Sequence, residues 1–224
     1  MSDTPAQLRA AVEGFRPSGS GPVPTDPWTM QYWEMSNAHA MILNALLAIY
    51  EQAPDVPKHK HTNFIGFCLV WCANFHAHHE HEENTYFAMY EPKVDTSFVQ
   101  EEHDAFQKGQ SEFESYLFAC LPPNHPYGQD KRTSATQAPL DFDGVRLQQL
   151  IDSFVKPLST HLAHEITILE PEKLKAAGMS KEEMVHIAEV TQAYGSQFAK
   201  VVKLPTRTQF LEGLPCALLA LDPL

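Results

Sequence analysis

Helical periodicity interrupted by proline constrains this chain more than any other feature. Apolar side chains recur every three or four residues through four long stretches, at about residues 28–53, 62–90, 96–120 and 143–170. This spacing gathers them on one face of a helix. Each stretch ends near a proline, which cannot continue a helix: Pro54, Pro92, Pro122 and Pro171. Because no alternating strand pattern lies between them, the sequence predicts an all-α fold, and four long helices in succession predict a bundle.

The rest of the chain is organised around these helices. Residues 1–27 contain five prolines and three glycines, and we expect an irregular N-terminal arm there. Residues 122–141, also rich in proline, are predicted to be a long loop. Ser180 and Glu183 match a capping box ahead of a fifth helix at about residues 181–203. The predicted organisation is therefore an arm (1–27), a helical domain (28–171), and a C-terminal helix with a tail (172–224).

Composition limits the possible partners. The chain has 224 residues, a formal net charge of −12 and 12 histidines. An acidic chain without a block of Lys or Arg is a poor ligand for nucleic acid or for an anionic membrane. The first residues show no basic and apolar leader, and no apolar stretch approaches the roughly 20 residues that span a bilayer. We therefore expect a cytoplasmic protein with no nucleic-acid or membrane partner.

Helical phase selects among the histidines. A residue advances about 100° around a helix, so residues three, four or seven apart share a face. On this count the apolar face of the second helix passes through His78 and Glu82, and that of the fourth helix passes through His161 and Glu165. His79 falls about 100° away from His78, on the flank of its helix. A buried carboxylate is costly unless it is paired or binds a metal, and two such His-x3-Glu pairs predict a shared site.

The two remaining helices each place one histidine on an apolar face, His39 and His103. The predicted metal ligands are His39, His78, Glu82, His103, His161 and Glu165. Four imidazoles and two carboxylates exceed one tetrahedral zinc site and suit two octahedral ions bridged by carboxylates. The H-E-x-x-H motif of zinc proteases does not occur.

Four motifs in order resemble the hemerythrin-like, or HHE cation-binding, domain. They are His39-x3-Leu43, His78-His79-x-x-Glu82-Glu83-x-x-Tyr86-Phe87, His103-Asp104-x-Phe106 and His161-Leu162-x-x-Glu165. The resemblance covers about residues 30–171. It implies an up-down-up-down four-helix bundle that holds two iron ions as a non-haem, oxo- or hydroxo-bridged diiron centre. Glu82 and Glu165 would bridge the ions, and the four histidines would be terminal ligands.

The chain departs from the oxygen-carrying members of that family. Those proteins have His-x3-His on the third helix, where this chain has Val99 ahead of His103, and an aspartate at the position of Ile166. The predicted site is thus one imidazole short, and an open position favours activation of oxygen over reversible carriage. His81, His164 and Glu83 are candidates either to fill the gap or to support the ligands by hydrogen bonds.

These features lead to one functional hypothesis and two alternatives. The first is a diiron protein that binds or activates a small oxidant (oxygen, peroxide or nitric oxide). Such a protein could be an oxidoreductase, for example an oxygenase that acts on an organic substrate. The second is a non-catalytic module that senses iron or oxygen, or handles iron, through its stability. The third is a zinc or nickel scavenger formed by the exposed histidines of the second helix, with the inward pairs being structural.

Overall fold

The computed structural model describes residues 3–122, 125 and 138–201, with residues 197–201 as backbone only. Every regular element in this part of the chain is helical, which confirms the all-α prediction. The four predicted long helices are α2 (Pro27–Gln52), α3 (His61–His81), α4 (Phe98–Cys120) and α5 (Gly144–Ile168). No described helix is both long and apolar enough to cross a membrane.

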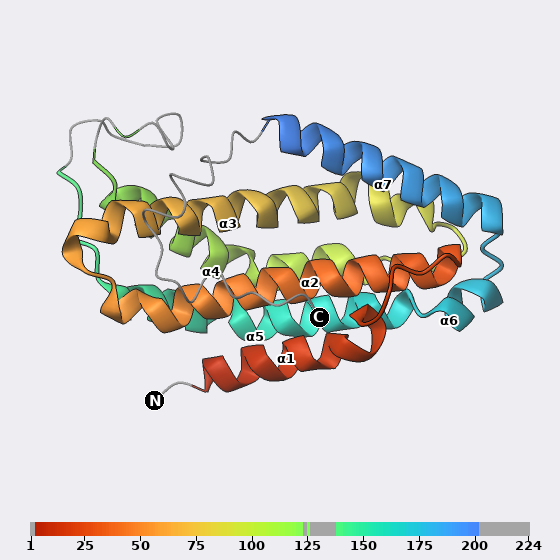
Figure 1. Ribbon diagram of the computed structural model, residues 1–224, viewed down its shortest axis with the longest axis horizontal. Helices are drawn as coiled ribbons and strands as arrows, with labels where there is room; N and C mark the ends of the chain where they lie inside the picture. The colour runs from red at the N-terminus through yellow and green to blue at the C-terminus, as the bar shows by residue number, and fades with distance from the viewer. Residues whose placement is uncertain (1–2, 123–124, 126–137, 202–224) are drawn as a thin grey trace.

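These four helices pack around a common core (Figure 1). Helix α2 contacts both α3 and α5, and α4 contacts the same two helices, so each of the four has two neighbours in the set. Trp71 of α3, Phe113 of α4 and Phe154 of α5 meet in the interior, with ring centroids 5.8 to 6.4 Å apart. Helix α5 runs on through Pro157 without ending there.

The second predicted helix is regular only as far as His81. A five-residue π-helical segment, η3 (Glu82–Tyr86), and a 3-10 turn, η4 (Phe87–Met89), follow it. Two further 3-10 turns, η1 (Ala53–Asp55) and η2 (Lys58–Lys60), connect α2 to α3. Single π-helical turns within α-helices are frequent at functional sites. Here the π segment begins at Glu82, one of the predicted ligands.

The expectation of an irregular N-terminal arm was wrong for most of its length. Residues Thr4–Gly19 form helix α1, which packs against α2 and α5 (Figure 1). Leu8, Val12 and Phe15 have helical spacing, and all three are buried. Pro5 stands in the first turn, where a missing N–H costs nothing, and Pro17 stands in the last turn. The two prolines therefore lie near the ends of the helix, where they do not prevent its formation.

The C-terminal part begins with a short helix that the sequence did not indicate, α6 (Pro171–Ala176), which contacts α2. The predicted capping box then forms ahead of α7 (Lys181–Val201). The Ser180 N–H donates to the Glu183 carboxylate over 2.7 Å, and the Glu183 N–H donates to Ser180 Oγ over 3.2 Å. Helix α7 lies against α2. The tail after residue 201 and most of the predicted 122–141 loop lie outside the described residues.

One glycine is required by a close approach between two segments. A Cβ on Gly144, the first residue of α5, would overlap the carbonyl group of Ala53, the first residue of η1. Backbone atoms cannot swing aside as the end of a long side chain can. We expect Gly144→Ala to lower the free energy of unfolding by about 2–3 kcal/mol, measured by urea denaturation.

The matched control for this substitution is Gly14→Ala in α1, where an added Cβ meets no atom within 4 Å. Alanine is the better helix former, so this change should leave stability unchanged or raise it by about 0.5–1 kcal/mol. Equal effects at the two positions would contradict the predicted overlap at Gly144.

Candidate metal centre

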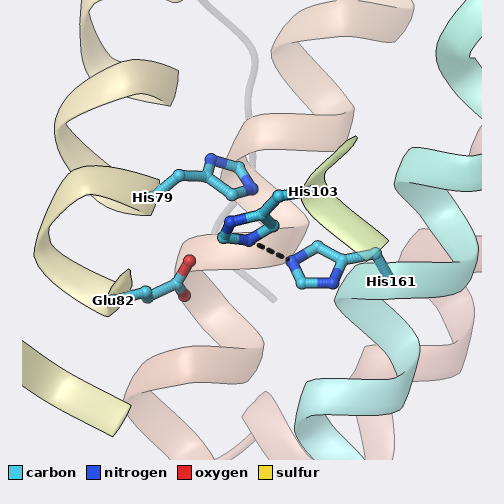
Figure 2. A group of neighbouring side chains, drawn as sticks. All are labelled: His79, Glu82, His103 and His161. Carbon is cyan, nitrogen blue, oxygen red and sulfur yellow. Dashed lines mark hydrogen bonds between the residues drawn. The ribbon is translucent and has the colours of Figure 1, made fainter. Parts of the chain in front are cut away.

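Buried histidines and glutamates from four helices meet in the interior as two neighbouring groups. One group consists of His79, Glu82, His103 and His161, and the other of His39, His78 and Glu82. Within each group one potential ligand atom per residue lies within 4.8 Å of all the others. Figure 2 shows the first group, in which side chains from α3, η3, α4 and α5 point toward one another. Glu82 belongs to both groups.

Two carboxylates lie between the groups. One oxygen of Glu165 is 3.4 Å from Nε2 of His39, and its other oxygen is 3.3 Å from Nε2 of His161. Glu82 Oε1 is 2.9 Å from Nε2 of His78 and 3.7 Å from Nε2 of His39. Glu165 thus presents one oxygen to each group, which is how a carboxylate shared by two ions is arranged.

The imidazole rings are oriented by hydrogen bonds to their outer nitrogens. Nδ1 of His39 lies 3.0 Å from the carbonyl oxygen of Leu162, and Nδ1 of His79 lies 2.9 Å from that of Phe75. These acceptors require a proton on Nδ1, which leaves the lone pair of a neutral ring on Nε2. Metal-binding histidines are commonly fixed by such a hydrogen bond on the far side of the ring.

The two other rings of the larger group are held by carboxylates in the same way. Nδ1 of His103 is paired with Glu83, and Nδ1 of His161 lies 3.1 Å from Glu102. Glu102 also accepts from Nδ1 of His164 over 2.8 Å, so it links a buried ring to a partly exposed one. With both Nδ1 atoms donating, the Nε2 atoms of His103 and His161 face each other only 2.8 Å apart (Figure 2).

Such a contact between two Nε2 lone pairs needs a positive charge between them. A proton on either ring would supply one, but it would make that ring a buried cation. Burial lowers the pKa of His161 to about 2, and the neighbouring His103 adds to this effect. Burial likewise lowers the pKa of His79 to about 3. The His161 and His79 rings are therefore neutral at pH 7, and a metal cation would match the lone pairs on their Nε2 atoms.

Several polar atoms of the site lack hydrogen bonds within the described part of the chain. They are Nε2 of His39, His78 and His79, and both carboxylate oxygens of Glu82 and Glu165. Leaving a buried polar group unsatisfied costs roughly 1–3 kcal/mol, and more for a charged one. So many inward-facing nitrogen and oxygen lone pairs in one place fit bound metal cations, which would coordinate them.

The two carboxylates differ in their electrostatic environments. Burial opposes the ionisation of Glu82, but the His78 and His39 imidazoles outweigh it and hold the pKa of Glu82 well below its usual range. Burial raises the pKa of Glu165 well above its usual range, and the charge of Glu82 adds to this effect. Two carboxylates so close together cannot both be charged cheaply unless a cation lies between them.

Aromatic side chains pack against the imidazole rings of the site. The Phe106 ring centroid lies 5.3 Å from that of His79 and 5.5 Å from that of His161, and the Phe75 ring lies 4.2 Å from that of His79. Phe15 of α1 contacts the His39 ring at 5.7 Å. The helix that was expected to be an irregular arm therefore covers part of the site.

The structure brings together all six residues that the sequence singled out, and it adds His79. Placing His79 on the flank of its helix was wrong, because its side chain is only 7% exposed and belongs to the larger group. Helix α3 contacts α4 as well as α2, so its buried sector is wide. His78 faces the group that includes His39 on α2, His79 faces the group that includes His103 on α4, and Glu82 lies between these directions.

The three candidates for a further ligand have other roles. Glu83 hydrogen-bonds to His103, and His164 reaches His161 only through Glu102. His81 points toward α7, where its ring stacks on Tyr194 with centroids 4.2 Å apart and its Nε2 lies 3.3 Å from Thr191. None of the three belongs to either group. Glu102 was missed, since nothing in the sequence distinguishes it from the exposed Glu101 beside it.

The imidazole count is therefore five, and the site is not one imidazole short as expected. His79 makes up for the position that Val99 occupies on α4. The donors are nitrogen and oxygen, with no thiolate among them, and their chemistry fits a metal ion held inside the protein. Comparison with protein-family models, curated proteins and solved structures finds no match for this chain.

Proposed function

We propose that this chain is a non-haem diiron protein that binds or activates a small oxidant: oxygen, peroxide or nitric oxide. The observation that supports this proposal most directly is that two ligand groups share Glu82. Glu165 presents one oxygen to each of these groups. A single ion would leave one group of buried donors unused. The proposed architecture is an up-down-up-down four-helix bundle of the hemerythrin-like kind formed by α2, α3, α4 and α5, consistent with the motifs that resemble that family.

The ligands divide unevenly between the two proposed ions. With both carboxylates shared, one ion has His39 and His78, and the other has His79, His103 and His161. That gives 2 + 2 = 4 donors on one side and 3 + 2 = 5 on the other. An octahedral ion takes about six. The ion on the His39–His78 side therefore has more open coordination positions for a small oxidant. These open positions favour oxidant chemistry.

Bound iron would supply the redox chemistry that side chains lack. The protein's own side chains would orient the ligands of the iron ions. Glu83 and Glu102 would fix the rings of His103 and His161 through Nδ1, while Phe75 and Phe106 pack against the ring of His79.

The test is metal analysis followed by optical spectroscopy. The protein is loaded with Fe(II) under anaerobic conditions, freed of excess metal, analysed for iron, and then mixed with oxygen or peroxide. We expect about two iron ions per chain and a charge-transfer band typical of an oxidised diiron centre. One tightly bound zinc ion per chain, or iron-loaded protein that shows no optical change with either oxidant, would reject the proposal.

A further inference from the structure

A second feature is a cavity of about 540 Å³ that lies between α2, α3 with the π segment that follows it, and α7. It opens to the surface beside the exposed residues Glu34, Val185 and Glu189. Small-molecule sites typically measure about 300–1,000 Å³. Its walls are largely apolar, formed by Pro27, Met30, Met35, Ala38, Val185 and Ala188. His78 and Glu82 also line it, so the cavity reaches the side of the metal centre that has fewer protein donors.

One buried amide in the cavity wall has an unused donor. Gln31 is only 1% exposed, and its Oε1 accepts a hydrogen bond from the Tyr86 hydroxyl over 3.1 Å. The Tyr86 hydroxyl in turn accepts from Tyr90 over 2.9 Å. This series of hydrogen bonds determines which end of the Gln31 amide is the oxygen. It leaves Nε2 of Gln31 without an acceptor among the described residues. A ligand with an oxygen acceptor would satisfy it.

Charge restricts the ligand further. The carboxylates of Glu34 and Glu189 line the cavity, and no Lys or Arg of the described residues does. Away from the metal centre, an anionic ligand would meet like charge in a mainly apolar site, and no described Lys or Arg of the lining would compensate its desolvation. The ligand that fits is uncharged, mostly apolar, and carries a carbonyl or hydroxyl oxygen.

A smaller hollow on the other side of the centre differs in character. It measures about 330 Å³ and is lined by His79 and His103 together with polar residues that include Glu80, Gln107 and Ser111. It borders the group that has three imidazoles. The apolar cavity is therefore the better place for an organic molecule beside the less fully coordinated ion.

We infer that the cavity between α2, α3 and α7 binds an uncharged, mainly apolar organic substrate, and that Gln31 Nε2 donates a hydrogen bond to its oxygen. The assignment of the cavity as a substrate site rests on the proposed diiron function. Binding of an organic molecule in the cavity can be measured with or without metal. Gln31 acts in recognition, and its amide is held in place by Tyr86.

The test compares three probes that share a naphthalene ring: 2-acetylnaphthalene, 2-ethylnaphthalene and 2-naphthoate. Binding is followed by fluorescence titration of iron-loaded and metal-free protein. We expect the ketone to bind about tenfold more tightly than the hydrocarbon, and the carboxylate to bind most weakly to the metal-free protein, where no cation faces it. Gln31→Met keeps the volume of the side chain and removes the donor, so it should abolish the difference between ketone and hydrocarbon. Equal affinities of the native protein for all three probes would overturn the inference.

A pair of substitutions on α7 locates the probe. Ala188→Phe fills the cavity and should weaken ketone binding at least tenfold, whereas Ala193→Phe lies on the same helix at an exposed position outside the cavity lining and should have no effect. Iron content should be the same in both variants. Unchanged ketone binding in Ala188→Phe would show that the probe binds elsewhere and would overturn the inference.

These measurements separate the two proposals. Iron loading without ketone binding would reject the cavity inference and leave the diiron proposal intact. Ketone binding that Ala188→Phe blocks, in a protein that takes up no iron, would support the binding site and reject the diiron proposal. A shift of the iron absorption band when the ketone binds would support both, since His78 and Glu82 belong to the cavity wall as well as to the centre.

Discussion

Loading the metal-free protein with Fe(II) is expected to raise its thermal midpoint by about 15 °C or more. An ion that binds only the folded state stabilises it by about 4 kcal/mol when its free concentration is 1,000 times its dissociation constant. Two such ions supply about 8 kcal/mol, and in a chain of this size about 1 kcal/mol shifts the midpoint by 2–4 °C. The physical source is the set of buried donors without hydrogen bonds, including Glu82 and Glu165.

The measurement is calorimetry of the metal-free and iron-loaded protein under anaerobic conditions, with a chelator added afterwards to reverse the shift. A change of less than about 3 °C at saturating iron would contradict the assignment of these buried atoms as ligands. A large shift would also be required by the sensing alternative. That alternative additionally needs a partner whose binding depends on iron, which an iron-dependent pull-down would detect.

The second large effect is loss of both ions on substitution of the carboxylate that the two groups share. Glu82→Gln keeps the shape of the side chain and removes the charge, so iron content should fall from about two ions per chain to nearly none. His39→Ala removes a donor from the smaller group alone. It should therefore lose one ion and retain the one held by His79, His103 and His161. Metal analysis after gel filtration measures both.

The control is His76→Ala, which removes a partly exposed histidine of α3 that pairs with Glu114 and belongs to neither group. Iron content should remain at about two per chain. The opposite pattern, in which His76→Ala loses metal and Glu82→Gln does not, would favour the surface zinc or nickel scavenger. Loss of folding in Glu82→Gln would be detected by circular dichroism, and Glu165→Gln then tests the same shared position.

Local sequence patterns predicted the long helices because their causes are local. Apolar spacing, proline at the ends and the Ser180–Glu183 capping box depend only on residues a few positions apart. The structure agrees with these predictions except in the second helix, which is α-helical only as far as His81 and does not continue as an α-helix to Pro92. The N-terminal segment was misjudged because its proline and glycine content received more weight than the helical spacing of Leu8, Val12 and Phe15. Helix α1 gains its stability by burying these residues against α2 and α5.

The candidate site shows the same division between local and tertiary causes. The sequence by itself determined that His78 and Glu82, like His161 and Glu165, share a buried helix face, since a separation of four residues is one turn. Whether His79 also faces inward depended on how many neighbours α3 has, and that is a property of packing. The hydrogen bond from His161 to Glu102, the sharing of Glu82 and the cavity beside Gln31 join residues from different helices. Only the tertiary structure could decide these, because no periodicity within one helix records which side chains of another helix it will meet.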